Sequence, residues 1–130
     1  MNRDPSASFM KAVLALILVA MLPGCATLDP QSRAPFVGDW LYADQVQSCR
    51  YSFRADGTFH GQVRQNAATV SRFTGRWTVK GDALLYTYLS DAFGRIPVGA
   101  TDRDQVLEVS RDSFFIRAAN GERRRYRRIR

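Results

Sequence analysis

Hydrophobic and polar residues alternate with a period of two along most of the chain after residue 36. In the stretch SCRYSFRA, residues 48–55, this alternation places Cys49, Tyr51 and Phe53 on one face and polar side chains on the other. Such a pattern is typical of half-buried strands, whereas helical periodicity is nearly absent from this part of the chain. The sequence therefore predicts an all-β domain.

Turn signals divide the domain into eight predicted strands. They are expected at residues 36–43, 48–55, 58–64, 73–79, 83–90, 104–110, 113–119 and 123–129. Asp56-Gly57 and Gly81-Asp82 stand in two of the connections, and such pairs favour tight turns. Parallel strands would need helical crossovers, so the short connections predict an antiparallel up-and-down meander of about eight strands. We expect it to form a small barrel or a strongly curled sheet.

A different pattern precedes this domain. Residues 12–22 lack polar side chains, and Arg3 and Lys11 stand before them. A positive flank, a short apolar run and small residues at its end are typical of a secretory signal peptide. At helical rise the run covers only about half of the ~30 Å hydrocarbon core, which is too short for a permanent span. Residues 1–24 are therefore predicted to be a signal peptide.

The end of that run carries a specific motif. Leu22-Pro23-Gly24-Cys25 resembles the lipobox of bacterial lipoproteins. The resemblance implies cleavage before Cys25, diacylglycerol on its thiol and a fatty acid such as palmitate on its new amino group. Ala26 in place of an aspartate then implies export to the outer membrane, with the protein facing the periplasm. The alternative is that Cys25 is a buried core residue.

Residues 25–35 contain two prolines and several small or polar residues, and we interpret them as the lipidated cysteine and a flexible tether. The folded domain is then expected at residues 36–130. That length supports one small hydrophobic core.

The positive charge changes this interpretation little. The chain has 19 Lys and Arg against 12 Asp and Glu, a formal net charge of +7. Such a surface could attract anionic lipid or the phosphates of lipopolysaccharide. The alternative is that the arginines lie on solvated strand faces. No aromatic-basic RNA motif is present, and we expect no nucleic-acid partner.

Three segments resemble the lipocalin-like small β-barrels. They are Gly38-Asp39-Trp40, the strand and turn YSFRADGTF at residues 51–59, and a last strand that combines an aromatic residue with arginines. In that family an early tryptophan lies at the closed end of the barrel, and a late arginine packs across its indole. The resemblance implies that Trp40 pairs with Arg128, which shares a face with Tyr126. Arg127 is the alternative partner if the last strand is shifted in register.

The inward face of the predicted strands is rich in aromatic residues, and these are the candidates for a ligand pocket. They are Tyr42, Tyr51, Phe53, Phe59, Trp77, Tyr86, Tyr88 and Phe114. In an open barrel they would line an apolar pocket for a small molecule or lipid. Alternatively they fill a solid core. The protein would then act through its surface on an envelope protein, as an inhibitor or an assembly factor.

The longest connection, residues 90–104, carries Phe93, Ile96 and Val98. Apolar residues on a long loop indicate either a lid or partner contact, or a loop folded over the barrel end.

Residues that could carry catalysis are sparse. His60 is the one histidine and falls on a polar strand face, while Cys49 falls on an apolar one. Asp102, Asp104 and Glu108 are interpreted as turn formers or ion-pair partners. No zinc spacing and no phosphate-binding loop is present, so we expect no metal, no cofactor and no enzymatic activity.

Overall fold

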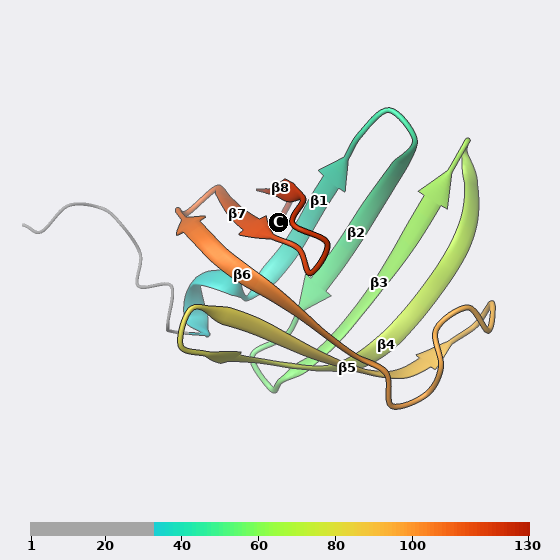
Figure 1. The fold of residues 1–130 in the computed structure, drawn as a ribbon, viewed down its shortest axis with the longest axis horizontal. Coiled ribbons are helices and arrows are strands. Elements are labelled where there is room, and N and C mark those ends of the chain that lie inside the picture. The colour runs from blue at the N-terminus through green and yellow to red at the C-terminus, as the bar shows by residue number, and fades with distance from the viewer. Residues whose placement is uncertain (1–32) are drawn as a thin grey trace, which may run out of the picture.

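The computed structural model describes residues 33–130 as a closed antiparallel barrel of eight strands (Figure 1). The predicted signal peptide, Cys25 and the tether up to residue 32 lie outside the described residues. A 3-10 turn, η1 (Ala34–Phe36), precedes the strands β1 (Gly38–Ala43), β2 (Gln47–Phe53), β3 (Thr58–Gln65), β4 (Ala68–Lys80), β5 (Ala83–Asp91), β6 (Thr101–Val109), β7 (Ser113–Arg117) and β8 (Arg123–Arg128). Each strand pairs with the next, and β8 pairs back to β1. The predicted up-and-down meander is confirmed.

The alternating strand directions give the barrel two distinct ends (Figure 1). One end, here called the N-terminal end, carries η1 and the chain's C-terminus together with the turns at residues 54–57, 81–82 and 110–112. The other, here called the loop end, carries the connections at residues 44–46, 66–67, 92–100 and 118–122. No helix within residues 33–130 is long and apolar enough to cross a membrane.

Two strands begin earlier than the sequence predicts. β4 starts at Ala68 rather than at residue 73, because Asn66 and Ala67 form a tight turn with positive φ angles of 50° and 64°. β6 starts at Thr101 rather than at residue 104, where its pairing with β5 begins. The long connection therefore shrinks to residues 92–100.

The core is a continuous cluster of aromatic rings inside the barrel. Phe53 lies 5.0 Å from Trp77 and 6.0 Å from Tyr86 between ring centroids, and Phe59 contacts Tyr86 at 5.7 Å. Trp77 also donates a hydrogen bond from Nε1 to the carbonyl of Arg54 at 3.0 Å. Most of the barrel interior is therefore filled by side chains.

One glycine is required for this packing. A Cβ on Gly75 of β4 would meet the carbonyl oxygen of Thr87 and come within 2.6 Å of the Phe59 ring. Glycine at this position lets an aromatic ring lie directly over the strand backbone.

The N-terminal end is closed by Trp40 and Arg128. The guanidinium carbon of Arg128 lies 4.2 Å from the centroid of the Trp40 ring, and the indole donates to the carbonyl of Phe36 at 2.8 Å. Arg128 also donates to the carbonyls of Pro35 at 3.0 Å and Val37 at 2.8 Å. These contacts satisfy its charge at the edge of the core. Because Pro35 takes part, the barrel's contacts extend beyond the predicted boundary at residue 36.

Candidate functional site

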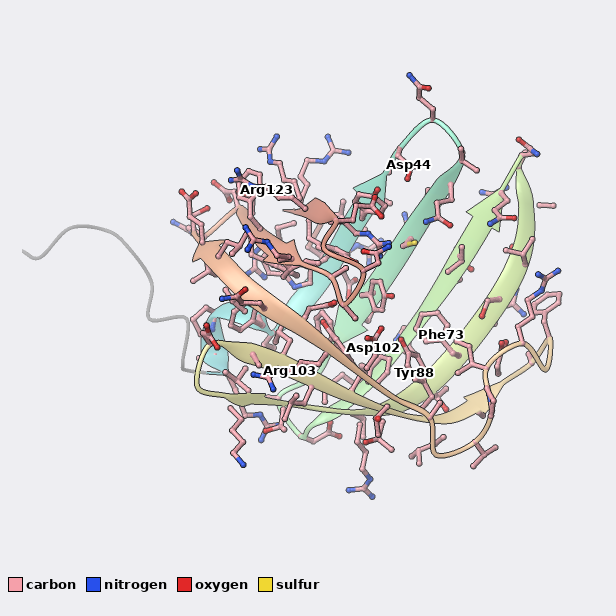
Figure 2. All side chains as sticks on the ribbon, viewed as in Figure 1. Asp44, Phe73, Tyr88, Asp102, Arg103 and Arg123 are labelled. Carbon is pink, nitrogen blue, oxygen red and sulfur yellow. The ribbon has the colours of Figure 1, made fainter. Side chains whose placement is uncertain are left out.

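A cavity of about 220 Å³, here called the inner cavity, remains near the loop end of the barrel. It is bordered by residues of five parts of the chain, which are Tyr51 of β2, Tyr86 and Tyr88 of β5, Asp102 and Asp104 of β6, the connection residues Ala118, Ala119 and Asn120, and Arg124 and Tyr126 of β8. In Figure 2 the labelled Tyr88 and Asp102 lie side by side at this place. Its lining is thus a set of tyrosines around charged side chains.

Asp104 is the most unusual member of this set. Its side chain is 8% exposed, which is rare for a carboxylate. Burial, with a smaller contribution from the charge of Asp102, raises the pKa of Asp104 to about 6, against an opposing hydrogen bond from Tyr86 and the charge of Arg124. Asp104 was predicted to be a turn former or an ion-pair partner, and within residues 33–130 it is neither, because β6 begins three residues earlier and turns this side chain into the barrel.

Arg124 places a guanidinium at the edge of the inner cavity. Its Nη2 donates to Oε2 of Glu122 at 3.1 Å, and its guanidinium carbon lies 5.3 Å from the centroid of the Tyr42 ring. The Tyr42 hydroxyl in turn donates to Glu122 Oε1 at 3.2 Å and to Asp44 Oδ2 at 2.8 Å. These contacts link β1 to the start of β8, where no backbone pairing joins the two strands.

The tyrosine rings stand close together around Asp104. The centroid of Tyr51 lies 5.7 Å from that of Tyr126 and 6.5 Å from that of Tyr86. Tyr88 of β5 borders the same cavity as Tyr51. Burial raises the pKa of Tyr51 and of Tyr86 well above the ordinary range, so both phenols stay neutral at physiological pH. The inner cavity thus offers neutral hydroxyls, ring faces and a carboxylate.

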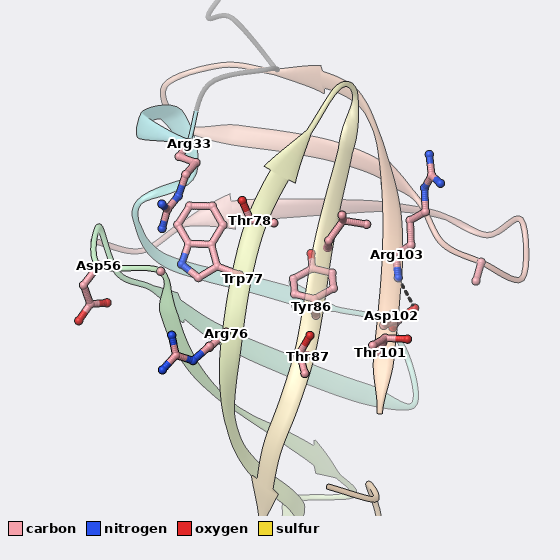
Figure 3. Close-up of a pocket in the computed structure, with 13 residues that line it drawn as sticks. Arg33, Asp56, Arg76, Trp77, Thr78, Tyr86, Thr87, Thr101, Asp102 and Arg103 are labelled. Carbon is pink, nitrogen blue, oxygen red and sulfur yellow. Dashed lines mark hydrogen bonds between the residues drawn. The ribbon is translucent and has the colours of Figure 1, made fainter. Parts of the chain in front are cut away.

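A second and larger concavity of about 830 Å³, here called the outer groove, lies on the outer face of β4, β5 and β6 (Figure 3). Its lining includes Arg76, Thr78 and Thr87, and Arg33 stacks on Trp77 at 5.1 Å to the ring centroid. Its polar residues are mostly exposed, so they remain solvated without a ligand. Three residues, Tyr86, Asp102 and Ala119, border both hollows.

The structure separates the predicted pocket residues into three groups. Tyr51, Tyr86 and Tyr88 border the inner cavity, and Trp77 borders the outer groove together with Tyr86. The remaining candidates are buried and pack against other aromatic rings. They are Tyr42, at the seam between β1 and β8, and Phe53, Phe59 and Phe114.

Two charged residues that border the inner cavity were not predicted from the sequence, although the alternation contained their signal. Asp104 lies two positions before the buried Val106, and Arg124 lies two positions before the buried Tyr126. The same alternation placed Arg128 on the inward face. Because charged residues are usually on the surface, neither Asp104 nor Arg124 was predicted to border a cavity.

The two residues considered for nucleophilic or metal chemistry lie apart from the inner cavity. His60 is exposed on β3, and its Nε2 lies 3.4 Å from Arg54 Nη2. Burial raises the pKa of the Cys49 thiol to about 11, so the thiol is protonated at neutral pH. Within residues 33–130 no group of three or more His, Cys, Asp or Glu residues is placed to hold a metal ion.

Comparison with solved structures identifies the architecture. A lipocalin-like protein from Bacteroides uniformis ATCC 8492 superposes with a TM-score of 0.55 at 18% sequence identity, covering 73% of this chain and 99% of that one. The fold is lipocalin-like. No protein-family model matches the chain, and a search of curated proteins gave no significant match. The similarity supports the resemblance inferred from Trp40 and the last strand, and it concerns the fold alone.

Proposed function

We propose that this protein is a lipid-anchored lipoprotein of the cell envelope whose lipocalin-like barrel binds a small molecule in the inner cavity. The observation that carries the proposal is Asp104, a carboxylate kept inside the barrel at 8% exposure. Burying a charge is costly, and natural proteins retain such groups mainly where they recognise something. The anchor on Cys25 and the location at the outer membrane, facing the periplasm, rest on the lipobox motif.

The residues that border the inner cavity change the class of ligand that we expect. An apolar ligand was expected from the aromatic residues, but many of them fill the core. The space that remains is bordered by phenol hydroxyls, Asp104 and Arg124. We therefore propose a small ligand with a polar or charged group. The volume of the inner cavity, about 220 Å³, is smaller than the ~300–1,000 Å³ of pockets for drug-sized ligands. The cavity is therefore too small for a whole lipid chain.

Binding is proposed rather than catalysis. The buried Cys49 thiol is held protonated, and His60 stands on the opposite, solvent-facing side of the strands. Neither is placed beside the carboxylates of the inner cavity, where a nucleophile and base would have to meet.

Native mass spectrometry of the full-length protein, purified from its own membrane in mild detergent, tests this proposal. We expect a small molecule bound at a ratio of one to one. Ala118→Phe, which fills the inner cavity, should abolish it, while Ala68→Phe on the exposed start of β4 should retain it. A bound mass that survives Ala118→Phe would place the ligand elsewhere, and a protein free of any bound mass would refute small-molecule binding.

A second candidate function is docking to an envelope protein through the loop at residues 92–100. Phe93 is 49% exposed and Val98 is 77% exposed, although Ile96 of the same loop packs against the core. Apolar side chains held out in solvent are typical of interaction sites. Photo-crosslinking in the living cell from position 93 should then yield one discrete partner, and crosslinking from Lys80 at the N-terminal end should not.

A further inference from the structure

The charges around the inner cavity are unbalanced. Two carboxylates, Asp102 and Asp104, border it, against the single guanidinium of Arg124. Within residues 33–130 the one ion pair joins Arg124 to Glu122, so the arginine's charge is already compensated by another carboxylate. Asp104 has no cation of the described part of the chain within salt-bridge distance. A buried carboxylate without a counter-ion is a position that a positive ligand group would stabilise.

The aromatic rings around Asp104 favour the same kind of ligand. Tyr51, Tyr86, Tyr88 and Tyr126 all border the inner cavity. The Tyr51 and Tyr126 rings pack edge to face at an interplanar angle of 73° and a centroid distance of 5.7 Å, which holds both rings at the border of the cavity. Ring faces attract cations, and cages of several aromatic residues are the usual sites for methylated ammonium groups.

The volume of the inner cavity and the carboxylate at its rim limit the class of ligand further. Its volume of about 220 Å³ suits a compact cation rather than a long chain. Asp102, whose side chain is exposed, borders both this cavity and the outer groove. An exposed carboxylate at the rim of the inner cavity raises the local concentration of cations beside it.

We propose that the inner cavity binds a compact organic cation, a methylated or primary ammonium compound, with Asp104 as its counter-ion and the four tyrosines as its aromatic cage. This inference rests on the proposed small-molecule function and names the class of ligand. Arg124 stays paired with Glu122, so its positive charge opposes a cationic ligand at the Tyr126 side of the cavity only weakly.

Three probes of nearly equal shape test the charge directly by isothermal titration calorimetry of the full-length protein at pH 7.5. They are choline, its neutral isostere 3,3-dimethylbutan-1-ol, and the anionic 3,3-dimethylbutanoate. We expect choline to bind on the order of tenfold or more tightly than the alcohol, because desolvated cation–π and ionic contacts act on the cation alone. The carboxylate should bind most weakly.

Two variants assign the effect to Asp104. Asp104→Asn should lower choline affinity on the order of tenfold and leave the affinity for the alcohol unchanged. Asp112→Asn, an exposed change at the N-terminal end, is the matched control and should alter neither. If Asp104→Asn does not fold, Asp102→Asn at the exposed rim should still weaken choline binding.

The pH dependence gives an independent readout. The groups facing Asp104 are Tyr51 of β2, Tyr86 and Tyr88 of β5, Asp102 of β6, and Arg124 and Tyr126 of β8. The phenols stay neutral and Arg124 stays charged across pH 5–8, so Asp104 is the group whose raised pKa falls in this range. Choline affinity should therefore fall as the pH drops below about 6, the pKa of Asp104.

The outcomes separate this inference from the function on which it rests. Equal affinities for choline and the alcohol, or tighter binding of the carboxylate, would overturn the cation assignment and leave small-molecule binding intact. If choline does not bind but the native spectrum contains a bound mass that Ala118→Phe removes, the cation assignment is likewise wrong and small-molecule binding stands. If choline does not bind and no bound mass is present, both the cation assignment and small-molecule binding are refuted.

Discussion

At the scale of single residues, the buried carboxylate of Asp104 lowers the free energy of unfolding at neutral pH. Burial raises its pKa in the folded protein to about 6, above the ordinary value of 3.8 that it has in the unfolded chain. Below about pH 4 the carboxyl is protonated in both states and costs little. As the pH rises through 6 the folded state must hold a buried charge, and stability is lost.

Asp104→Asn should remove this loss. We expect wild type to lose about 2–3 kcal/mol of unfolding free energy relative to the variant between pH 4 and pH 8, the value of a shift of about two pKa units. Urea denaturation at both pH values measures the difference. Asp112→Asn serves as the control. A variant that tracks wild type at both pH values would show that Asp104 is solvated in the folded protein.

The contact between Trp40 and Arg128 allows a second test at this scale. Trp40→Ala removes a fully buried indole and should destabilise by roughly 3–5 kcal/mol. Arg128→Ala should cost more than Arg125→Ala, because Arg125 lies on the outer face and Arg128 donates to four backbone carbonyls. A double-mutant cycle by urea denaturation should couple Trp40 and Arg128 by at least ~0.5 kcal/mol. Strict additivity would contradict the stacking.

Residue-level prediction succeeded where alternation and resemblance agreed. Trp40 and Arg128 were paired by resemblance and meet at 4.2 Å, and Tyr51 was placed inward by alternation and borders the inner cavity. Asp104 was not predicted to point inward because the predicted strand began at this residue, which placed its carboxylate next to a loop, whereas β6 begins at Thr101. A volume of empty space cannot be read from sequence at all, since it depends on how neighbouring rings settle.

At the scale of elements, the loop at residues 92–100 is held in place by Asp91. Its carboxylate accepts hydrogen bonds from the Ser71 hydroxyl and from the backbone amides of Arg72, Phe93, Arg95 and Ile96. The sequence left open whether this loop is a lid or is folded over the barrel end. The network and the packing of Ile96 make it a fixed cover with Phe93 and Val98 exposed.

Asp91→Ala should release this loop without unfolding the barrel, because the strands keep their own hydrogen bonds. We expect faster amide hydrogen exchange at Phe93 and Ile96 and unchanged exchange at Trp77 of the core. Asp82→Ala, at the N-terminal end, is the control. Unchanged exchange at Phe93 would mean that Asp91 does not fix the loop.

Element boundaries were predicted where the turn chemistry is strong and missed where it is weak. Asp56-Gly57 and Gly81-Asp82 gave correct turns, but Asn66-Ala67 did not signal one, because alanine rarely adopts a positive φ. The pairing of β6 with β7 shifts between Val106 and Glu108, which brings Val109 inward. Such an irregularity changes the alternation locally and has no clear mark in the sequence.

At the scale of the whole molecule, the described chain begins at the end opposite the loop end. Arg33 stacks on Trp77 and η1 packs beside Trp40, both toward the N-terminal end. The inner cavity is bordered by the connection at residues 118–120, at the other end. The inner cavity therefore lies toward the end of the barrel opposite the point where the described chain begins.

Cys25→Ser should abolish the anchor. We expect the variant to remain an unprocessed precursor that takes up no labelled palmitate, because the thiol that carries the lipid is gone. Metabolic labelling in the native cell measures this, with Cys49→Ser as the matched control. Labelling that persists in Cys25→Ser would refute the lipoprotein proposal and leave the barrel's binding function untouched.

A crystal structure of the protein purified from its own membrane tests whether the inner cavity is the ligand site. We expect density for a small molecule between Tyr51, Tyr86 and Asp104, with a polar or positive group at the carboxylate. Ordered water alone in the inner cavity, with a bound molecule in the outer groove beside Trp77, would contradict it.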